Sequence, residues 1–414
     1  MAGEMPLAGL KVVDLTRHMA GPYATVMMAD YGADVIKIES VPKGDPTRGM
    51  GLHFNQGESA LFLMWNRGKR SLAIDMRDPR GLDAVKKLCA EADVFVENYR
   101  PGVAAKIGLG YEELAELNPR LIYCSVSAFG PEGPYSAYPG TDPVLQAMSG
   151  VMGVTGEADG GPVLVGVPMA DFTSAMVGFQ GILLALQARE RSGRGQKVDV
   201  SMLHSMMHSL TTRLAGYWAS GAEKDPTRFG SAHSVVVPYQ AFESASGYFV
   251  AGVWADDAWP PFCRAIDRED LIDDPKFSTN VARVENREEL LGMLTALFKT
   301  RPTEEWEESF HEARALFGPV LTFSEVLSHP QVEASGILDE LEHPKIGTLP
   351  QLRSPIALSE SEGGLAPTAP PLLGADTRDV LAEIGLPADE VDALIAAGVA
   401  IADPEGAPDA AAAK

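Results

Sequence analysis

The chain has 414 residues, of which 45% are hydrophobic and 22% charged, a composition typical of a globular protein with two or three domains. Its formal net charge of −23 argues against nucleic acid or an anionic membrane surface as a partner, because both require a basic surface. Three widely separated cysteines (Cys89, Cys124 and Cys263) indicate neither a disulfide framework nor a metal site. We therefore expect a reducing, cytoplasmic location, and the N-terminal residues do not resemble a secretory signal.

The first third of the chain alternates apolar segments with helical patterns. Strands are expected at residues 10–15, 33–39, 70–76, 93–98 and 120–127, and helices at residues 21–33, 79–92 and 111–118. This alternation predicts an α/β fold with a mainly parallel, Rossmann-like sheet covered on both faces. Ligands of such sheets bind beyond the carboxyl ends of the strands, so the segments that follow those ends are the candidate binding residues.

Two long helices are expected next, at residues 171–189 and 198–220. The first helix is expected to bury one apolar face, formed by Phe172, Met176, Phe179, Leu183 and Leu186. The second helix carries a methionine-rich stripe that is typical of packing rather than catalysis. The uncharged stretch 172–188 contains Thr173, Ser174 and Gln180, which favours a core helix over a membrane span.

The pattern of the chain changes between residues 223 and 324, where short strands precede helical segments. This segment predicts a smaller α+β domain. The larger domain is expected to combine residues 1–222 with residues 325–400, and residues 401–414 are expected to form a flexible tail.

Asp171 stands at the head of the helix expected at residues 171–189. The positive end of the helix dipole would keep its carboxylate ionised near neutral pH, ready to attack an activated acyl group. Aspartate is also a favoured N-cap residue, and the position by itself favours this structural role.

Several segments, in order along nearly the whole chain, resemble the class III CoA-transferase family. They include GADVIKIE at residues 32–39, NRGKRSLAID at 66–75, VENYRPGVAAKIGLGYEEL at 96–114, GPYSAYPGTDPVLQAMSGVMGVTGE at 133–157 and GRGQKVDVSML at 193–203. In that family the segment that matches PMADFTS carries a nucleophilic aspartate, so the resemblance implies that Asp171 is this residue.

The resemblance implies a reaction in covalent stages. Asp171 attacks an acyl-CoA thioester to give a mixed anhydride, and CoA thiolate then converts the anhydride to an aspartyl-CoA thioester. An incoming small carboxylic acid, which we expect to include dicarboxylates such as succinate, reverses these steps. Coenzyme A is then a substrate, no permanent cofactor or metal is needed, and family members form intertwined homodimers.

The resemblance also implies which residues contact CoA. These residues follow successive strand ends: His18, Met19 and Ala20, then Ile74, Asp75 and Arg77, and then Asn98, Tyr99, Arg100 and Lys106. Arg67, Lys69 and Arg70 offer further cations. Some family members carry an arginine after the second strand, where this chain has Ser40, so a phosphate contact there is expected either to be lost or to be supplied by Lys43 or Arg48.

Asp142 matches the segment that supplies an acidic residue near the reacting carboxyl groups, although it also precedes Pro143 as a local cap would. Related 2-methylacyl-CoA racemases are the alternative function, and they use a histidine base in a Gly-His-Asp sequence. Here Thr141 occupies that position, which favours transfer over racemisation. His204 and His208 have no acidic ligand between them, and His233 is open to either a catalytic or a loop role.

Overall fold

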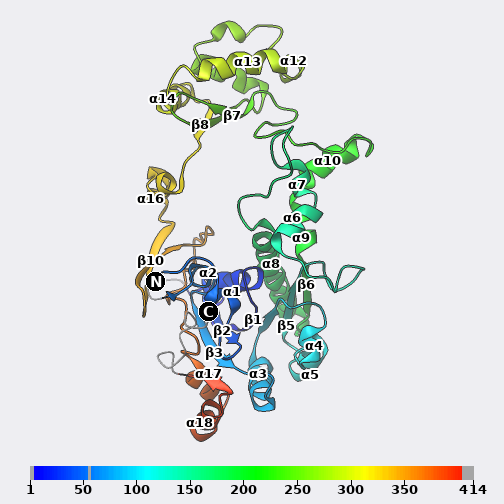
Figure 1. Cartoon of the computed structure of the whole chain (residues 1–414), viewed down its shortest axis with the longest axis vertical. Helices are drawn as coiled ribbons and strands as arrows, with labels where there is room; N and C mark the ends of the chain where they lie inside the picture. The colour runs from blue at the N-terminus through cyan, green and yellow to red at the C-terminus, as the bar shows by residue number, and fades with distance from the viewer. Residues whose placement is uncertain (1–3, 55–56, 403–414) are drawn as a thin grey trace. The chain divides into compact units, whose positions relative to one another are not determined.

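The computed structural model describes residues 4–54 and 57–402, and its chain forms two compact units (Figure 1). Unit 1 comprises Met1–Val151, Leu164–Ala215 and Ser335–Lys414. Unit 2 comprises Met152–Val163 and Gly216–Ala334, so it contains the whole of the segment 223–324 that was expected to form a smaller domain.

Unit 1 is built on a seven-stranded sheet with the order β12-β3-β2-β1-β4-β5-β6. Six strands are parallel, and β12 pairs antiparallel with β3 at one edge. The strands are β1 (Lys11–Leu15), β2 (Asp34–Glu39), β3 (Lys69–Ile74), β4 (Val94–Glu97), β5 (Ile122–Ser127), β6 (Lys197–Ser201) and β12 (Ala400–Ile401). The chain builds outward from β1 to β3 and then returns to the other side of β1 with β4. The expected mainly parallel α/β fold is confirmed, with its topological switch point between β1 and β4.

Both faces of this sheet are covered, because successive strand residues point to opposite sides. Val12 faces a layer that includes α1 (Ala20–Ala29) and α8 (Met169–Ser192). Val13 faces the opposite layer, which contains α3 (Pro79–Glu91), α5 (Tyr111–Leu117), α17 (Thr377–Glu383) and α18 (Ala388–Ala396). Burial on both sides explains why the strands read as nearly continuous apolar runs in the sequence.

Helix α8 packs through much of the expected face, together with a row of small side chains. Its buried side chains are mostly small and include Ala170, Ser174, Ala175 and Gly178, which allow close approach to α1. Of the five apolar residues expected in the core, Phe179 is buried and Leu183 and Leu186 pack against the core, whereas Met176 is 40% exposed. By length and composition α8 could span a membrane, but it packs against α1, β5 and β6 within unit 1.

The helix expected at residues 198–220 is wrong in its first part. Residues Lys197–Ser201 form β6 at the edge of the sheet, and they are followed by α9 (Met202–Ser209) and α10 (Thr211–Ala219). The alternation of Val198 and Val200 with polar residues suits an edge strand, which presents two different faces. The Ser201 side chain then accepts a hydrogen bond from the His204 amide and caps α9.

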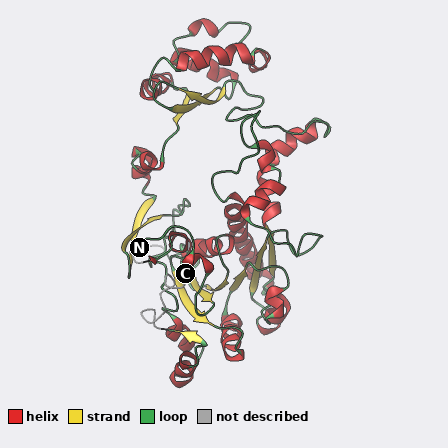
Figure 2. Cartoon of the chain, in the orientation of Figure 1, coloured by secondary structure: helices red, strands yellow, loops and turns green. Residues whose placement is uncertain are grey.

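Unit 2 contains a three-stranded antiparallel sheet and several helices (Figure 2). The strands are β7 (Tyr239–Glu243), β8 (Tyr248–Gly252) and β9 (Leu316–Pro319), and the main helices are α11 (Trp259–Ala265), α12 (Asn280–Glu285), α13 (Arg287–Phe298) and α14 (Thr303–Ala313). Aromatic rings fill its core, with Phe298 in ring contact with Phe249, Phe310 and Trp306.

The remaining elements are shorter. They are α2 (Ala60–Trp65), α4 (Val103–Lys106), α6 (Asp142–Met148), α7 (Val151–Val154), α15 (Phe323–Leu327), α16 (Pro330–Ser335) and the hairpin β10 (Leu338–His343) and β11 (Gly347–Leu352). Of the tail expected at residues 401–414, Ile401 belongs to β12, and residues 403–414 lie outside the described residues.

Candidate active site

Asp171 is the third residue of α8, a helix of 24 residues. Pro168 occupies the N-cap position, so Asp171 is not the cap of its helix. The unpaired amides of the first turn and the helix dipole place positive potential beside this half-buried carboxylate.

The cap of α8 is supplied by Asp142, the first residue of α6. One oxygen of Asp142 accepts hydrogen bonds from the amides of Ala170 at 2.6 Å and Asp171 at 3.4 Å. The other oxygen accepts a bond of 2.7 Å from the Gln146 side chain. Asp142 is only 9% exposed, and it holds the helix end that presents Asp171.

The surroundings of Asp171 raise the pKa of its carboxyl group towards neutral pH. Burial and the neighbouring charge of Asp142 raise the pKa of Asp171 to about 6, while a hydrogen bond from the Ala20 amide acts in the opposite direction. At pH 7 about nine-tenths of such groups are ionised. Asp171 therefore keeps the ionised form that a nucleophile needs, with an unusually basic carboxylate.

The loop between β1 and α1 brings the Ala20 amide to Asp171. His18 in this loop has φ of 61°, a left-handed conformation that is uncommon for a residue with a side chain. Asn98, which follows β4, fixes the loop at both backbone groups of Arg17: its oxygen accepts from the Arg17 amide at 2.8 Å, and its amide donates to the Arg17 carbonyl at 2.7 Å. Two of the segments expected to contact CoA, residues 18–20 and 98–99, thus lie side by side.

Beneath the loop lies a buried ionic cluster that the sequence analysis missed. Asp14 accepts from the Thr16 amide at 2.9 Å and pairs with Lys69 at 2.9 Å, and Lys37 donates to the Thr16 carbonyl at 3.0 Å. Burial alone would raise the pKa of Asp14, but Lys69 and Lys37 lower it far below its usual range. The signal in the sequence is a charged residue inside each of two apolar strands, Asp14 and Lys37.

Three cations considered for CoA binding are engaged within unit 1. Arg67 forms a bidentate pair with Asp30 at 2.7 and 2.8 Å, Lys69 pairs with Asp14, and Arg70 pairs with Asp34 and Glu383. Arg48 is likewise bound to Glu39, at 2.6 and 2.7 Å, and is not free to replace an arginine at position 40. Lys43 is exposed.

The other residues expected to contact CoA follow the ends of β3 and β4. Ile74 is buried at the end of β3, and Arg77 is 84% exposed on its side chain and bound to Asp75. Arg100 and Lys106 are exposed after β4. This edge of the sheet therefore carries accessible cations in a chain whose net charge is −23.

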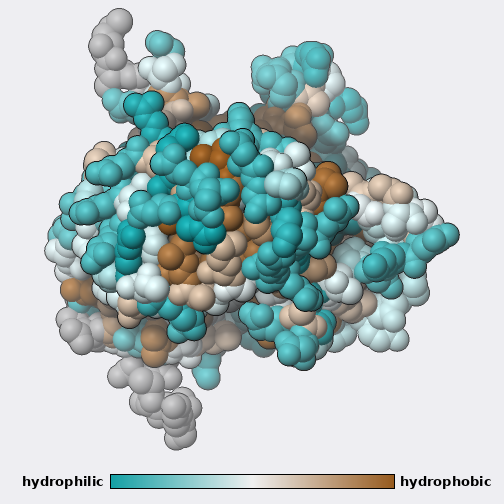
Figure 3. All heavy atoms as spheres, turned by 90° about the horizontal axis from the view of Figure 1, so that it is seen from above, coloured by the Kyte–Doolittle hydropathy of each residue, from teal (hydrophilic) through white to brown (hydrophobic). Residues whose placement is uncertain are grey.

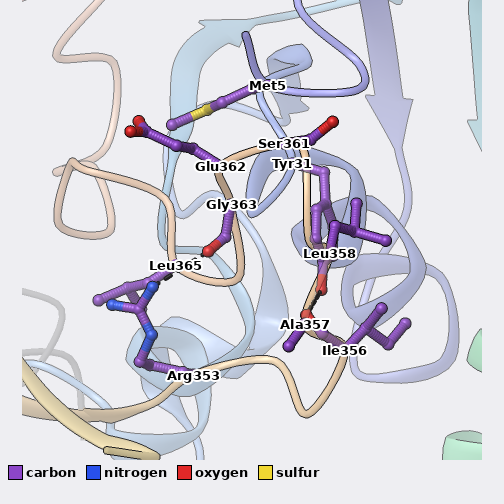
Figure 4. Close-up of a pocket in the computed structure, with 10 residues that line it drawn as sticks. All are labelled: Met5, Tyr31, Arg353, Ile356, Ala357, Leu358, Ser361, Glu362, Gly363 and Leu365. Atoms are coloured by element: carbon purple, nitrogen blue, oxygen red, sulfur yellow. Dashed lines mark hydrogen bonds between the residues drawn. The ribbon is translucent and has the colours of Figure 1, made fainter. Parts of the chain in front are cut away.

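One cavity in unit 1 lies away from these residues. It has a volume of about 380 Å³ and is lined by residues that include Tyr31, Arg353 and Leu358 (Figure 4). Two of its polar side chains have internal partners: the Tyr31 hydroxyl donates to the Ile356 carbonyl, and Arg353 pairs with Asp339. In the parts of the chain that the structure describes, no group of three or more histidine, cysteine or acidic side chains is placed to hold a metal ion.

Comparison with known proteins identifies the chemistry of this fold. A model of CoA-transferase family III matches residues 7–377. The chain belongs to this family. It is 40% identical over 401 residues to the succinyl-CoA:glutarate CoA-transferase of Mus musculus, covering 95% of this chain and 90% of the relative. It is 37% identical to the succinate–glutarate CoA-transferase of Agrobacterium fabrum, covering 92% and 96% of the two chains. The crystal structure of a CaiB/BaiF family protein from Brucella suis superposes with a TM-score of 0.82, at 37% identity, over 92% of this chain and 100% of that one.

This CoA-transferase carries no histidine where the racemase alternative requires one. Thr141 occupies the N-cap position of α6, and its hydroxyl does not titrate near neutral pH. His233 lies in unit 2, where its ring contacts Tyr239 and Trp254 edge-on. The site around Asp171 in unit 1 thus has one basic carboxylate and a buried acidic neighbour, an arrangement suited to nucleophilic transfer.

Proposed function

We propose that the enzyme exchanges CoA between succinyl-CoA and a second dicarboxylic acid such as glutarate, through covalent intermediates on Asp171. The observation that carries the mechanism is the half-buried Asp171, whose pKa is raised to about 6 and which has the Ala20 amide as a hydrogen-bond donor. The names of the mouse and Agrobacterium relatives support the substrate class.

In the first half-reaction, an Asp171 oxygen attacks the thioester carbonyl carbon, the carbon–sulfur bond breaks, and CoA leaves as a thiolate. The thiolate then attacks the Asp171 carbonyl carbon of the mixed anhydride, and succinate departs. The second acid attacks the aspartyl-CoA thioester, and the same steps in reverse release the new CoA ester. No proton is consumed in the exchange.

The residues of unit 1 have distinct tasks in this scheme. Asp142 holds the first turn of α8, and the Ala20 amide stabilises negative charge on an Asp171 oxygen when that carboxyl becomes tetrahedral. Excluding water protects both covalent intermediates from hydrolysis.

Replacing Asp171 by alanine tests this mechanism. We expect the Asp171→Ala enzyme to lose about 10⁴-fold or more in kcat with succinyl-CoA and glutarate, because the nucleophile is absent. Asp83→Ala, on the exposed side of α3, is the matched control and should stay within about twofold of the wild type. A folded Asp171→Ala enzyme with a tenth of the wild-type activity would rule the mechanism out.

We also propose that the enzyme is a homodimer of intertwined chains. Large apolar side chains are exposed on each unit: Leu184 on α8 is 73% exposed, Trp254 is 67% exposed and Phe323 is 90% exposed. The face drawn in Figure 3 likewise shows hydrophobic residues among polar ones at the surface. Exposed apolar surface of this kind is typical of an interface. Light scattering should give twice the chain mass of 44.1 kDa, and a particle of 44.1 kDa would contradict the dimer.

A cytoplasmic location is proposed from the cysteines. Cys89, Cys124 and Cys263 are buried and free, and burial raises the pKa of each thiol, so they are unreactive. Cell fractionation tests this proposal, and recovery of the enzyme from an oxidising compartment would contradict it.

A further inference from the structure

Arg17 lies at the switch point of the sheet, directly after the end of β1. Its backbone is clamped by Asn98, which follows β4, and one of its side-chain nitrogens donates to the Ser40 hydroxyl after β2 at 3.3 Å. Arg17 thus touches the residues that follow both neighbours of β1. In open parallel sheets this crevice is where ligands bind.

The guanidinium of Arg17 is held by neutral groups. Its central carbon lies 4.8 Å from the centroid of the Tyr99 ring, and the Tyr99 hydroxyl also interacts with Arg17. Within residues 4–54 and 57–402 this side chain forms no ion pair. The result is a half-buried cation in a fixed orientation that lacks an anion.

Three other arginines of unit 1 that are buried or half-buried are different. Arg48 pairs with Glu39, Arg67 with Asp30, and Arg189 with Asp93, at 2.6 to 2.9 Å. Such pairing is the usual state for a guanidinium removed from water. Arg17 is therefore positioned to receive a negative charge from a ligand.

The anion that fits this place is a phosphate rather than the reacting carboxylate. The Arg17 guanidinium lies against Tyr99 and Ser40, whereas Asp171 lies against Asp142 and the Ala20 amide, so the two side chains have different neighbours. The exposed cations Arg100 and Lys106 follow the same strand, β4, as the Tyr99 ring on which Arg17 rests. A guanidinium fork matches phosphate oxygens well.

We propose that Arg17 binds a phosphate group of CoA and that Tyr99 and Ser40 orient its side chain. Arg17 then supplies the phosphate contact that neither Arg48, which is paired with Glu39, nor the uncharged Ser40 supplies. The inference rests on the proposed function, because it requires that the enzyme bind a CoA ester. Asn98 acts on the backbone of Arg17, so its clamp is independent of the Arg17 side chain.

Calorimetric binding of CoA to the full-length enzyme tests the inference without catalysis. Arg17→Gln should raise the Kd for CoA by about 10- to 100-fold, the loss expected for a charge-assisted contact. Arg120→Gln is the matched control, since Arg120 precedes β5 at the opposite edge of the sheet and should leave the Kd within about twofold. The double variant Arg17→Ser with Ser40→Arg places the guanidinium on the neighbouring strand and should recover much of the affinity.

The outcomes separate the claims. If dephospho-CoA binds wild type and Arg17→Gln equally, the contact is to the 3′-phosphate, whereas a loss with both ligands assigns it to the diphosphate. CoA binding that is unchanged in Arg17→Gln, or a rise in the KM for glutarate alone, would overturn the inference and leave the proposed function standing. Failure of the wild type to bind CoA would overturn both.

Discussion

Two groups of carboxylates in unit 1 differ in what surrounds them. Asp14, Glu39 and Asp45 each lie against a cation, which offsets the effect of burial and lowers the pKa of all three. Asp142 and Asp171 lie at the first turn of α8 with backbone amides and each other as neighbours, and the pKa of Asp171 is raised. The carboxylates buried beside cations thus have lowered pKa values, whereas Asp171, which lacks such a cation, has a raised pKa and a more basic carboxylate.

The two groups are joined through the loop after β1. Asp14 and Lys37 bind the amide and carbonyl of Thr16, and four residues later the Ala20 amide donates to Asp171. Asp14 and Lys37, together with the Lys69 partner of Asp14, form a paired cluster. This cluster thus fixes the backbone segment that donates a hydrogen bond to Asp171.

The largest effect on stability is expected from removing one member of the paired cluster. Lys69→Met would leave the fully buried Asp14 without its partner, which costs about 3–5 kcal/mol of unfolding free energy. Lys11→Met is the matched control, because the Lys11–Glu91 pair is about half exposed and contributes less than about 1 kcal/mol. Urea unfolding measures both, and equal losses would show that the cluster is not structural.

Replacing Asp171 should have the opposite effect on the free energy of unfolding, because its charge destabilises the folded protein. The folded pKa of Asp171, about 6, lies above its usual value of 3.8, so the wild type loses stability as the pH rises from about 4 to about 6. Asp171→Asn removes this cost and should be more stable than the wild type by about 1–3 kcal/mol at pH 8, with little difference at pH 4. Thermal unfolding at both pH values measures this, and a less stable variant at pH 8 would contradict the assignment.

The smallest effect concerns the charge of Asp142. Wild-type kcat/KM should fall below about pH 6 as Asp171 takes up a proton. Asp142→Asn keeps an oxygen to accept from the Ala170 amide but removes the negative charge, so this acid limb should move to lower pH by about half a unit. Asp83→Asn is the control. A limb that does not move, or moves to higher pH, would show that Asp142 does not influence Asp171.

The parallel sheet could be predicted from the sequence because strands buried on both faces read as apolar runs separated by helical patterns. Asp171 was placed correctly at the head of a long helix. Its role as a possible cap was excluded only by the structure, because the actual cap, Asp142, lies 29 residues earlier in the chain. A local sequence pattern does not show a hydrogen-bond partner that lies so far away in the chain.

The cations were harder to assign for the same reason. Arg67, Lys69 and Arg70 look alike in the sequence, and each is engaged by a carboxylate from another element. The sequence did not indicate a role for Arg17. Among the described residues, this arginine contacts Ser40 and Tyr99 and forms no ion pair. On α8, the pattern of large apolar residues predicted only part of the buried face, because small side chains such as Ala170 and Gly178 are buried beside Phe179.

The most direct test of the covalent mechanism is the intact mass of the enzyme after brief exposure to succinyl-CoA without an acceptor acid, followed by peptide mapping. We predict a CoA-sized adduct on the peptide that contains Asp171, its loss when glutarate is added, and its absence from Asp171→Ala. An enzyme that exchanges CoA at full rate with no adduct, or with the adduct on another residue, would contradict the account.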